Sequence, residues 1–453
     1  MKPMTLREIA DACCGNLITK GSADENSVIT DISIDSRKIK EGFLYIPIKG
    51  ERFDGHDFIS SAAENGAVCT LTEKESEAHD ISTIIVKSTF QALKDIAEYY
   101  RRLFKNVKII GISGSSGKTS TKEMIYSVLS ENFSVMKTEG NLNNEIGVPQ
   151  TIFRISDDYD AAVIEMGINH FGEMTNLAKM VRPDIAVITN IGCAHLEFLG
   201  SRDGILRAKT EMLPFISPDG ITVLNGDDDK LRTVKHENTV FFGFDKENEV
   251  RAEDIKPCGF DGTEFTIVRG SSKQKAFVPA LGNHMVMNAL AAYAIAEKLS
   301  MPDDKIISGI SNFKNIDGRF NVIKTSEYTL INDCYNANPE SVKASLKVLS
   351  TLEGRRVAIL ADMKELGEDS EQMHYETGKL ASELVDVLIC IGNEAKNIQN
   401  GAMESELKIQ TAHFDTNERA VAELKNILRK DDTILIKGSH SMKLSQITEF
   451  LKR

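Results

Sequence analysis

The sequence predicts an α/β protein of three domains, and three observations support this. Apolar strands alternate with helical stretches of roughly 10–15 residues, the pattern of parallel sheets. A length of 453 residues corresponds to three domains of about 150 residues each. A glycine-rich turn, Gly114–Gly117, links an apolar strand to a helix. We therefore expect a small N-terminal α/β domain, a central parallel sheet of the phosphate-loop type and a Rossmann-like C-terminal domain.

The first domain is expected to span residues 1–85, where short apolar runs alternate with Gly and Asp. Its clearest candidate strands are Phe43–Ile48 and Val68–Leu71. The apolar positions of 89–104 recur at helical spacing, so this stretch is expected to be a helix leading to a strand at Val107–Ile112.

The central domain is expected to span residues 86–314 and the last domain residues 315–453. Strands of the central domain are expected at Ala161–Ile164, Ile185–Ile188 and Ile221–Leu224, and an Ala-rich helix at Asn288–Leu299. Strands of the last domain are expected at Thr329–Asn332, Val357–Ala361, Val387–Ile391 and Thr433–Ile436.

Composition limits the classes of partner. The 54 Lys and Arg against 67 Asp and Glu give a formal net charge of −13, which argues against a general nucleic-acid binder. The N-terminus lacks the continuous apolar core of a signal peptide, and no run approaches the roughly 18 apolar residues of a membrane span. The seven Cys are scattered without CxxC spacing, as expected of reduced thiols in the cytoplasm.

Polar side chains repeatedly follow the expected strands, at the sheet edge where open parallel sheets bind ligands. We expect them to share a cleft between domains. In the central domain they are Ser113–Thr119, Glu165, His195 and Asn225–Asp229, and in the last domain Asp333, Asp362 and Lys437–His440.

The segment Gly114–Ser120 predicts a phosphate-binding loop. Its glycines permit a tight turn whose N–H groups surround phosphate oxygens, and the following helix N-terminus adds positive potential. Lys118 would then contact the β- and γ-phosphates, while the Thr119 hydroxyl would ligate Mg²⁺. The strict GxxxxGK[ST] pattern is not met, because Ile112 stands where the first glycine belongs. The alternative is a plain glycine turn between strand and helix.

Glu165, His195 and Lys209 form a second set of candidates. A carboxylate that ends an apolar strand needs a cationic partner, and together with an imidazole it suits a divalent ion near the γ-phosphate. Each taken alone has a structural alternative. Lys209 has Ile205, Leu206, Met212 and Leu213 at helical spacing, so within an expected helix over 202–213 it lies on the apolar stripe. Either its ammonium reaches solvent, or it is a desolvated amine of lowered pKa that can form a carbamate with CO₂.

Segments along essentially the whole chain resemble the Mur ligase family, the ATP-dependent amide ligases of peptidoglycan precursor synthesis. The matching segments are Asp35–Arg37, 49–58, Gly114–Thr119, 140–149, 165–174, 191–201, 282–292, 317–320, 332–341, 361–367 and 437–444. The shortened phosphate loop is the form that this family uses. EMG at 165–167, NHFGEM at 169–174 and YNANP at 335–339 favour the D-alanyl-D-alanine-adding member, and no DNPR-like segment is present.

The resemblance implies roles for individual residues. Thr119, Glu165 and His195 would hold two Mg²⁺ ions, with Lys209 carbamylated and Lys118 catalytic. The remaining ATP-site residues would be Gly114, Ser115, Ser116, Gly117, Ser120, His284, Asn288, Arg319 and Asp333. Substrate-side residues would be Ser36, Arg37, Thr138, Asn141, Asn143, Asn144, Tyr335, Asn336 and Asn338. Several have simpler interpretations: Asn338-Pro339 is a helix start, 282–284 a helix cap and 35–37 a solvated turn.

The implied activity is ATP-dependent ligation of D-alanyl-D-alanine to UDP-N-acetylmuramoyl-tripeptide through an acyl phosphate, by a cytoplasmic monomer without nucleic-acid or membrane partners. The alternatives are a phosphate-loop ATPase or kinase, a non-catalytic nucleotide-binding module, or a relative that adds another amino acid. Neither of the first two explains a lysine on an apolar stripe.

Overall fold

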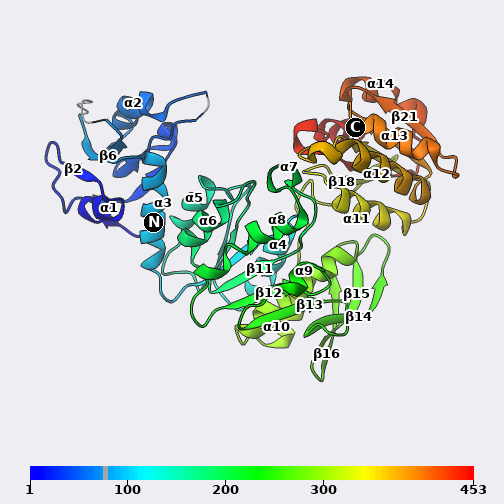
Figure 1. The fold of residues 1–453 in the computed structure, drawn as a ribbon, viewed down its shortest axis with the longest axis horizontal. Coiled ribbons are helices and arrows are strands. Elements are labelled where there is room, and N and C mark those ends of the chain that lie inside the picture. Colours follow the sequence, from blue (N-terminus) through cyan, green and yellow to red (C-terminus); the bar gives the residue numbers. More distant parts are fainter. Residues whose placement is uncertain (51, 75–79, 453) are drawn as a thin grey trace. The chain divides into compact units, whose positions relative to one another are not determined.

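The computed structural model describes residues 1–50, 52–74 and 80–452, and shows an α/β fold built on four sheets (Figure 1). Three of the sheets are mostly parallel, which confirms the predicted fold class. The chain forms two compact units. The first comprises Met1–Ser113, Phe133–Ala186 and Thr210–Ile221, and the second Gly114–Asn132, Val187–Lys209 and Thr222–Arg453. Within the described residues, no helix is long and apolar enough to cross a membrane.

The N-terminal part holds a two-stranded and a five-stranded sheet. The small sheet pairs β1 (Met4–Thr5) with β3 (Val28–Ile29), and the larger has the order β2-β7-β6-β5-β4. Its strands are β2 (Asn16–Ile18), β7 (Ser82–Ile85), β6 (Ala67–Thr72), β5 (Phe43–Tyr45) and β4 (Asp31–Ser33). The helical segments are α1 (Leu6–Ala12), η1 (Ser36–Lys38), η2 (Gly55–Phe58), α2 (Ile59–Glu64) and α3 (Thr89–Arg102). The expected strand at 43–48 is shorter because Pro47 has no N–H to donate to a neighbouring strand.

The central sheet has nine strands in the order β16-β15-β14-β13-β12-β11-β8-β10-β9. Their bounds are β8 (Lys108–Ser113), β9 (Val135–Lys137), β10 (Ala161–Glu165), β11 (Ile185–Ile188), β12 (Ile221–Asn225), β13 (Thr239–Gly243), β14 (Val250–Pro257), β15 (Thr263–Arg269) and β16 (Ser272–Val278). Its helices are α4 (Lys118–Leu129), α5 (Gly147–Ile152), α6 (Glu173–Val181), α7 (Leu196–Leu199), α8 (Arg202–Thr210), α9 (Asn283–Lys298) and α10 (Asp303–Ser311), with short turns η3 (Leu213–Phe215) and η4 (Leu231–Thr233).

Two expected helices have different bounds. The helix expected over 202–213 ends at Thr210, and η3 follows it with Pro214 near its start. Because proline lacks an N–H and disfavours helical geometry in the residue before it, Met212 and Leu213 lie outside α8. The Ala-rich helix begins at Asn283 rather than Asn288, directly after Gly282, whose φ is 92°.

The C-terminal sheet has six strands in the order β17-β18-β22-β19-β20-β21. They are β17 (Asn321–Lys324), β18 (Thr329–Asp333), β19 (Arg356–Ala361), β20 (Val387–Ile391), β21 (Gln410–Phe414) and β22 (Thr433–Lys437). The helical segments are α11 (Pro339–Ser350), η5 (Gly367–Asp369), α12 (Ser370–Leu384), α13 (Ala395–Glu404), α14 (Asn417–Ile427), η6 (His440–Met442) and α15 (Ser445–Leu451).

Helices cover both faces of this last sheet, as in a Rossmann-like fold. Alternate strand residues point to opposite faces. Ala358 and Leu360 of β19 pack in one core with α11, α12 and α13, whereas Val357 and Ile359 pack in another with α14 and α15. Because β18, β19 and β22 are parallel, their carboxyl ends place Asp333, Asp362 and Lys437 at the same edge of this sheet.

Candidate active site

A glycine-rich loop connects β8 to α4. Gly114 and Gly117 have φ values of 151° and 77°, a region that other residues rarely adopt. A Cβ on Gly114 would lie 1.9 Å from the Thr189 hydroxyl oxygen, so only glycine fits there. The loop ends at the N-terminus of α4, where free N–H groups favour an anion.

The segment that follows β11 holds this loop in shape. The Thr189 hydroxyl donates to the Ser116 carbonyl at 2.6 Å, and the Ser116 N–H donates to Asn190 Oδ1 at 3.0 Å. The Ser115 hydroxyl in turn accepts from the Gly192 N–H at 3.0 Å. Residues 189–192 therefore fix the phosphate loop from outside, a contact that no local sequence pattern predicts.

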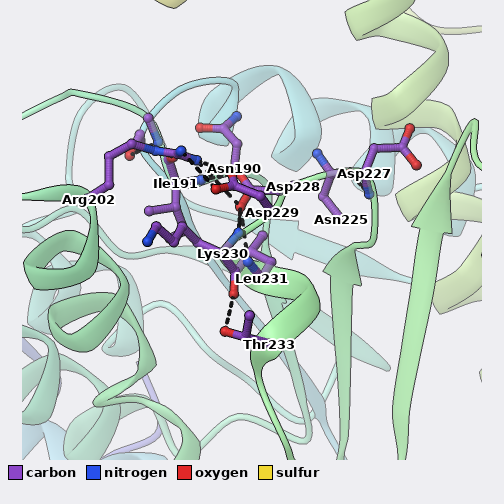
Figure 2. A network of polar contacts seen from close by, with 12 residues as sticks. Asn190, Ile191, Arg202, Asn225, Asp227, Asp228, Asp229, Lys230, Leu231 and Thr233 are labelled. Carbon is purple, nitrogen blue, oxygen red and sulfur yellow. Dashed lines mark hydrogen bonds and ion pairs between the residues drawn. The ribbon is translucent and has the colours of Figure 1, made fainter.

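Acidic residues after β12 brace the same segment, as Figure 2 shows. Asp228 accepts from the Ile191 N–H at 2.8 Å, and Arg202 donates to the Ile191 carbonyl at 2.9 Å. Arg202 also pairs with Asp229 through both terminal nitrogens. Asn225 donates to the Thr189 carbonyl at 3.1 Å. The polar residues 225–229, expected at the strand end, thus support the loop indirectly.

Lys118 and Thr119 begin α4. Lys118 Nζ donates to the Gly114 carbonyl at 2.8 Å, so its ammonium lies over the loop that would hold phosphate. The Thr119 hydroxyl accepts from Arg319 Nη2 at 3.1 Å, and the Arg319 guanidinium stacks 3.9 Å from the centre of the Tyr335 ring. Arg319, two residues before β17, thereby reaches the phosphate loop.

Asn288 and His284 occupy the start of α9. The Asn288 side chain accepts from the Thr121 hydroxyl at 2.8 Å, and its Oδ1 lies 3.9 Å from where a Cβ on Gly117 would stand. His284 packs edge-on against Phe320 at 5.7 Å, and burial lowers the pKa of its imidazole. Asn288 therefore lies beside the loop, whereas His284 lies against Phe320, the residue that follows Arg319 in the chain.

Asp333, at the end of β18, is engaged within its own domain. Its Oδ2 accepts from Lys437 Nζ at 2.6 Å and from the Ser345 hydroxyl at 2.7 Å, and its Oδ1 accepts from the Phe320 N–H at 3.2 Å. Lys437 is only 3% exposed, so this ion pair is buried. Asp333 remains a candidate for the ATP site, with a carboxylate that these contacts hold in place.

Glu165 ends β10 with its residue only 2% exposed. Its Oε1 accepts from Asn143 Nδ2 at 2.9 Å, and its backbone N–H donates to the Thr138 hydroxyl at 3.0 Å. Asn144 Oδ1 accepts from the Gly147 N–H at the start of α5, and the Asn141 carbonyl accepts from the Asn143 N–H. The structure thus brings Thr138, Asn143 and Glu165 into one cluster, as expected of neighbouring site residues.

Lys209 is completely buried in α8. Its Nζ is buried, so the amine does not reach solvent, and it has no hydrogen-bond partner among the described residues. Burial, together with the charge of Lys118, lowers the pKa of this amine well below its ordinary value. Nearby Glu211 has a different role, because it accepts from the backbone N–H groups of Gly172 and Thr175 at the start of α6.

His195 lies immediately before α7 in a left-handed conformation, with φ 62°. Its Nδ1 is 2.7 Å from Glu365 Oε2, and this contact lowers the pKa of the glutamate. Glu340, near the start of α11, accepts from the Cys193 N–H at 3.1 Å. Sequence reasoning missed both glutamates, because only the fold brings their loops to residues 193–195.

The remaining expected substrate residues show local roles. The exposed Arg37 forms a two-pronged ion pair with Asp35, at 2.8 and 2.9 Å. Asn338 caps α11 through the Ser341 N–H, with Pro339 as the first helical residue, which confirms the helix-start interpretation. The Asn336 carbonyl accepts from Lys437 Nζ, while Ser36 is buried in η1. Tyr335 is exposed, with the Arg319 guanidinium stacked over its ring.

The candidate metal ligands are individual side chains rather than a preformed cluster. Across the described part of the chain, no three His, Cys, Asp or Glu side chains gather into a ready metal site. The candidate donors are the Thr119 hydroxyl and the His195 imidazole in the second unit and the Glu165 carboxylate in the first. Mg²⁺ is commonly held by one or two carboxylates together with substrate phosphates and water, so each oxygen donor taken by itself is of a kind that suits it.

The fold and these residues define a class: a phosphate-loop α/β protein in which Arg319, just before the first strand of a second sheet, contacts the residue that follows the loop lysine. Family models agree with that class. The Mur ligase family catalytic domain matches residues 28–112, the Mur ligase middle domain residues 112–296, and the Mur ligase glutamate ligase domain residues 318–440.

Full-length relatives agree as well. The chain is 36% identical to the UDP-N-acetylmuramoyl-tripeptide–D-alanyl-D-alanine ligase of Bacillus subtilis, covering 99% of this chain and 98% of the relative. It is 33% identical to the enzyme of that name from Escherichia coli, covering 100% and 99%. A crystal structure of MurF from Acinetobacter baumannii superposes with a TM-score of 0.92 at 31% identity over 100% of both chains. MurF ligase from Thermotoga maritima, in complex with ADP, gives 0.84 at 30% identity, covering 93% and 97%. The chain belongs to the Mur ligase family.

Proposed function

We propose that this chain is the ATP-dependent ligase that joins D-alanyl-D-alanine to UDP-N-acetylmuramoyl-tripeptide in peptidoglycan synthesis. The full-length identity to ligases of that name supports the substrate pair. One structural observation supports the catalytic part: Arg319 donates to Thr119 of the phosphate loop, so residues of the last domain would share in the nucleotide site.

ATP would bind at Gly114–Ser120. The loop N–H groups and the α4 N-terminus would receive its phosphates, and Lys118 would exchange the Gly114 carbonyl for a phosphate oxygen. Arg319 and Asp333 would meet the nucleotide from the last domain, and His284 and Asn288 from α9. The bound ADP of the Thermotoga maritima relative is consistent with a nucleotide site in this family.

The reaction would begin when the terminal carboxylate of the tripeptide attacks the γ-phosphate of ATP, giving an acyl phosphate and ADP. Two anions must approach each other, so Lys118 and Arg319 would offset their charge and fix an in-line geometry. The neutral amine of D-alanyl-D-alanine would then attack the acyl carbonyl, and the resulting tetrahedral intermediate would expel phosphate. Thr138, Asn141, Asn143 and Asn144 would orient the tripeptide end.

Two Mg²⁺ ions would be held by Thr119, Glu165 and His195, and would neutralise phosphate charge. Lys209 Nζ is buried and has no hydrogen-bond partner among the described residues, which fits a carbamate. A neutral amine can add CO₂ to form this anion, and Mg²⁺ would then be its cationic partner. Ser36 and Arg37 would contact the uridine nucleotide, and Tyr335, Asn336 and Asn338 the dipeptide.

We also propose the domain limits 1–85, 86–314 and 315–453, and a monomer in the cytoplasm. The end of β7 at Ile85 and the start of α3 at Thr89 support the first limit, and the family match that begins at 318 supports the second. Seven free cysteines fit a reducing compartment.

Phosphate release from ATP tests the function. We expect release by the purified chain with Mg²⁺ only when UDP-N-acetylmuramoyl-tripeptide and D-alanyl-D-alanine are both present. Release that needs neither substrate would indicate an ATPase, and no release under any of these conditions would indicate a binding module. Replacing D-alanyl-D-alanine with single amino acids is the matched control for another member of the family.

A further inference from the structure

We propose that Glu365 is a positioning residue for His195: its carboxylate pairs with Nδ1 of the imidazole, which orients the ring and leaves Nε2 available for a divalent cation. This inference rests on the proposed function, because it assumes a metal at His195. It goes further by making the metal site depend on a residue of the last domain that belongs to neither the phosphate loop nor the central sheet.

The contact is a short ion pair. His195 Nδ1 lies 2.7 Å from Glu365 Oε2, with the imidazole 18% exposed and the glutamate side chain 45% exposed, so the histidine side of the contact is the part shielded from water. Metal-binding histidines commonly donate their second ring N–H to a carboxylate, which fixes the tautomer and strengthens the ligand. Glu365 stands in that position relative to His195.

Both partners have an uncommon backbone conformation. The φ angles of His195 and Glu365 are 62° and 65°, in the left-handed region that side chains other than Gly, Asn and Asp seldom adopt. Such conformations persist where the surrounding structure imposes them, and they concentrate at functional sites. That two residues in direct contact share this feature points to a selected geometry.

The loop carrying Glu365 is firmly anchored. The Met363 N–H donates to His374 Nε2 at 2.9 Å, and the Lys364 N–H donates to the Ser439 hydroxyl at 2.9 Å. Lys364 Nζ also pairs with Asp362 at 2.9 Å. The residues just before Glu365 are therefore held by α12, by the segment after β22 and by the end of β19, which pre-organises its carboxylate.

Residues 193–195, which include His195, receive a second contact from the last domain. Glu340 Oε1 accepts from the Cys193 N–H at 3.1 Å, two residues before His195. On its other side the segment is bonded to the phosphate loop through Gly192 and Ser115. Glu365 thus adds an ion-pairing contact to a segment that already joins the last domain to the nucleotide loop.

Metal affinity tests the inference without any turnover. Mn²⁺ alone would be titrated into the full-length chain, with free Mn²⁺ followed by electron paramagnetic resonance. Loss of an outer-shell partner typically weakens metal binding by about 10- to 100-fold, so we expect a loss in that range for Glu365→Ala and a smaller one for Glu365→Gln. The matched control is Glu368→Ala, which removes an exposed glutamate three residues along the same loop and should bind Mn²⁺ like the parent chain.

A spectroscopic readout separates positioning from general damage. In protein with ¹⁵N-labelled histidine, the His195 signals, assigned by their loss in His195→Gln, should report a protonated Nδ1 and a bare Nε2. Glu365→Ala should erase that preference, and Glu368→Ala should keep it.

Three results would overturn the proposal: unchanged Mn²⁺ affinity in Glu365→Ala, an equal loss in the Glu368→Ala control, or no saturable Mn²⁺ binding by the parent chain. The phosphate-release assay tests the proposed function separately. That function fails if the parent chain releases phosphate from ATP at the same rate with and without the two substrates.

Discussion

At the scale of single residues, Lys209 shows how burial lowers the pKa of a lysine amine. A lysine at a fully buried position is costly in its charged form, and no carboxylate among the described residues is hydrogen-bonded to its Nζ. The folded chain therefore favours the neutral amine. Such a position lowers the stability of the folded chain.

Replacing Lys209 with methionine should therefore stabilise the fold. The unfolded chain binds a proton at this amine below its ordinary pKa of 10.5, whereas the folded chain releases it at a lower pH. The lysine thus costs stability at every pH below 10.5: the cost is fully present below the lowered pKa and shrinks as the pH rises from there toward 10.5. Thermal unfolding in bicarbonate-free buffer should show a higher midpoint for Lys209→Met at pH 7, with a smaller gain at pH 9.5. Arg207→Met, which replaces an exposed cation on the same helix, is the control; a lower midpoint for Lys209→Met would show that the buried amine does not cost stability.

Removing the amine should also remove activity in a way that small acids can repair. We expect Lys209→Ala to lose about 10- to 100-fold in the rate of phosphate release, as losses of metal-supporting groups do. Added short carboxylic acids should restore part of that rate, because their carboxylate can occupy the place of a carbamate. Chloride at matched ionic strength is the control. Activity unchanged by the substitution would exclude Lys209 from the mechanism.

Individual site residues could be predicted only where the chain itself brings them together. Gly114–Thr119 needs no long-range information, because strand, turn and helix follow one another in the sequence. Glu365 and Glu340 could not be found in this way. The Glu340–Cys193 contact joins positions 147 residues apart, and the Glu365–His195 contact joins two left-handed residues that are still farther apart in the sequence, so no local pattern encodes either.

At the scale of elements, the strands with continuous apolar runs were predicted well. Ile185–Ile188 and Val387–Ile391 have the expected bounds, since strands buried on both faces read as unbroken apolar segments. The antiparallel strands β14, β15 and β16 were missed. Their exposed positions carry residues such as Glu264, Lys273 and Lys275, so no apolar run reveals them.

The contact between α12 and α13 depends on two glycines. A Cβ on Gly378 would lie 1.8 Å from the Ile398 carbonyl oxygen, and one on Gly401 would lie 2.0 Å from that of Tyr375. The helices approach so closely that any side chain at these positions would push them apart.

Gly378→Ala should therefore destabilise the C-terminal sheet domain by about 1–3 kcal/mol, the usual cost of overpacking. Urea unfolding followed by circular dichroism would measure the shift. Lys379→Ala, at the next and exposed position of α12, should leave the midpoint nearly unchanged. Equal midpoints for Gly378→Ala and the parent chain would show that the two helices can separate without cost.

At the scale of the whole molecule, the net charge of −13 contrasts with the anionic substrates of the proposed reaction. In that reaction the attraction of the substrates would come from local groups, namely Lys118, Arg319, the N-terminus of α4 and Mg²⁺. Arg319 contacts Thr119 of the glycine-rich loop, and Glu340 and Glu365 contact residues 193 and 195, so in the proposed mechanism the C-terminal sheet would help to complete the nucleotide site.

The most direct test of the acyl-phosphate mechanism follows one oxygen atom through the reaction. The tripeptide would carry ¹⁸O in its terminal carboxylate, and the phosphate released with ATP, Mg²⁺ and D-alanyl-D-alanine would be examined by mass spectrometry. The carboxylate oxygen that attacks the γ-phosphate leaves with it when the amine displaces phosphate, so the released phosphate should contain one ¹⁸O. Phosphate free of ¹⁸O, with the label retained in the tripeptide, would contradict the acyl-phosphate ligase mechanism.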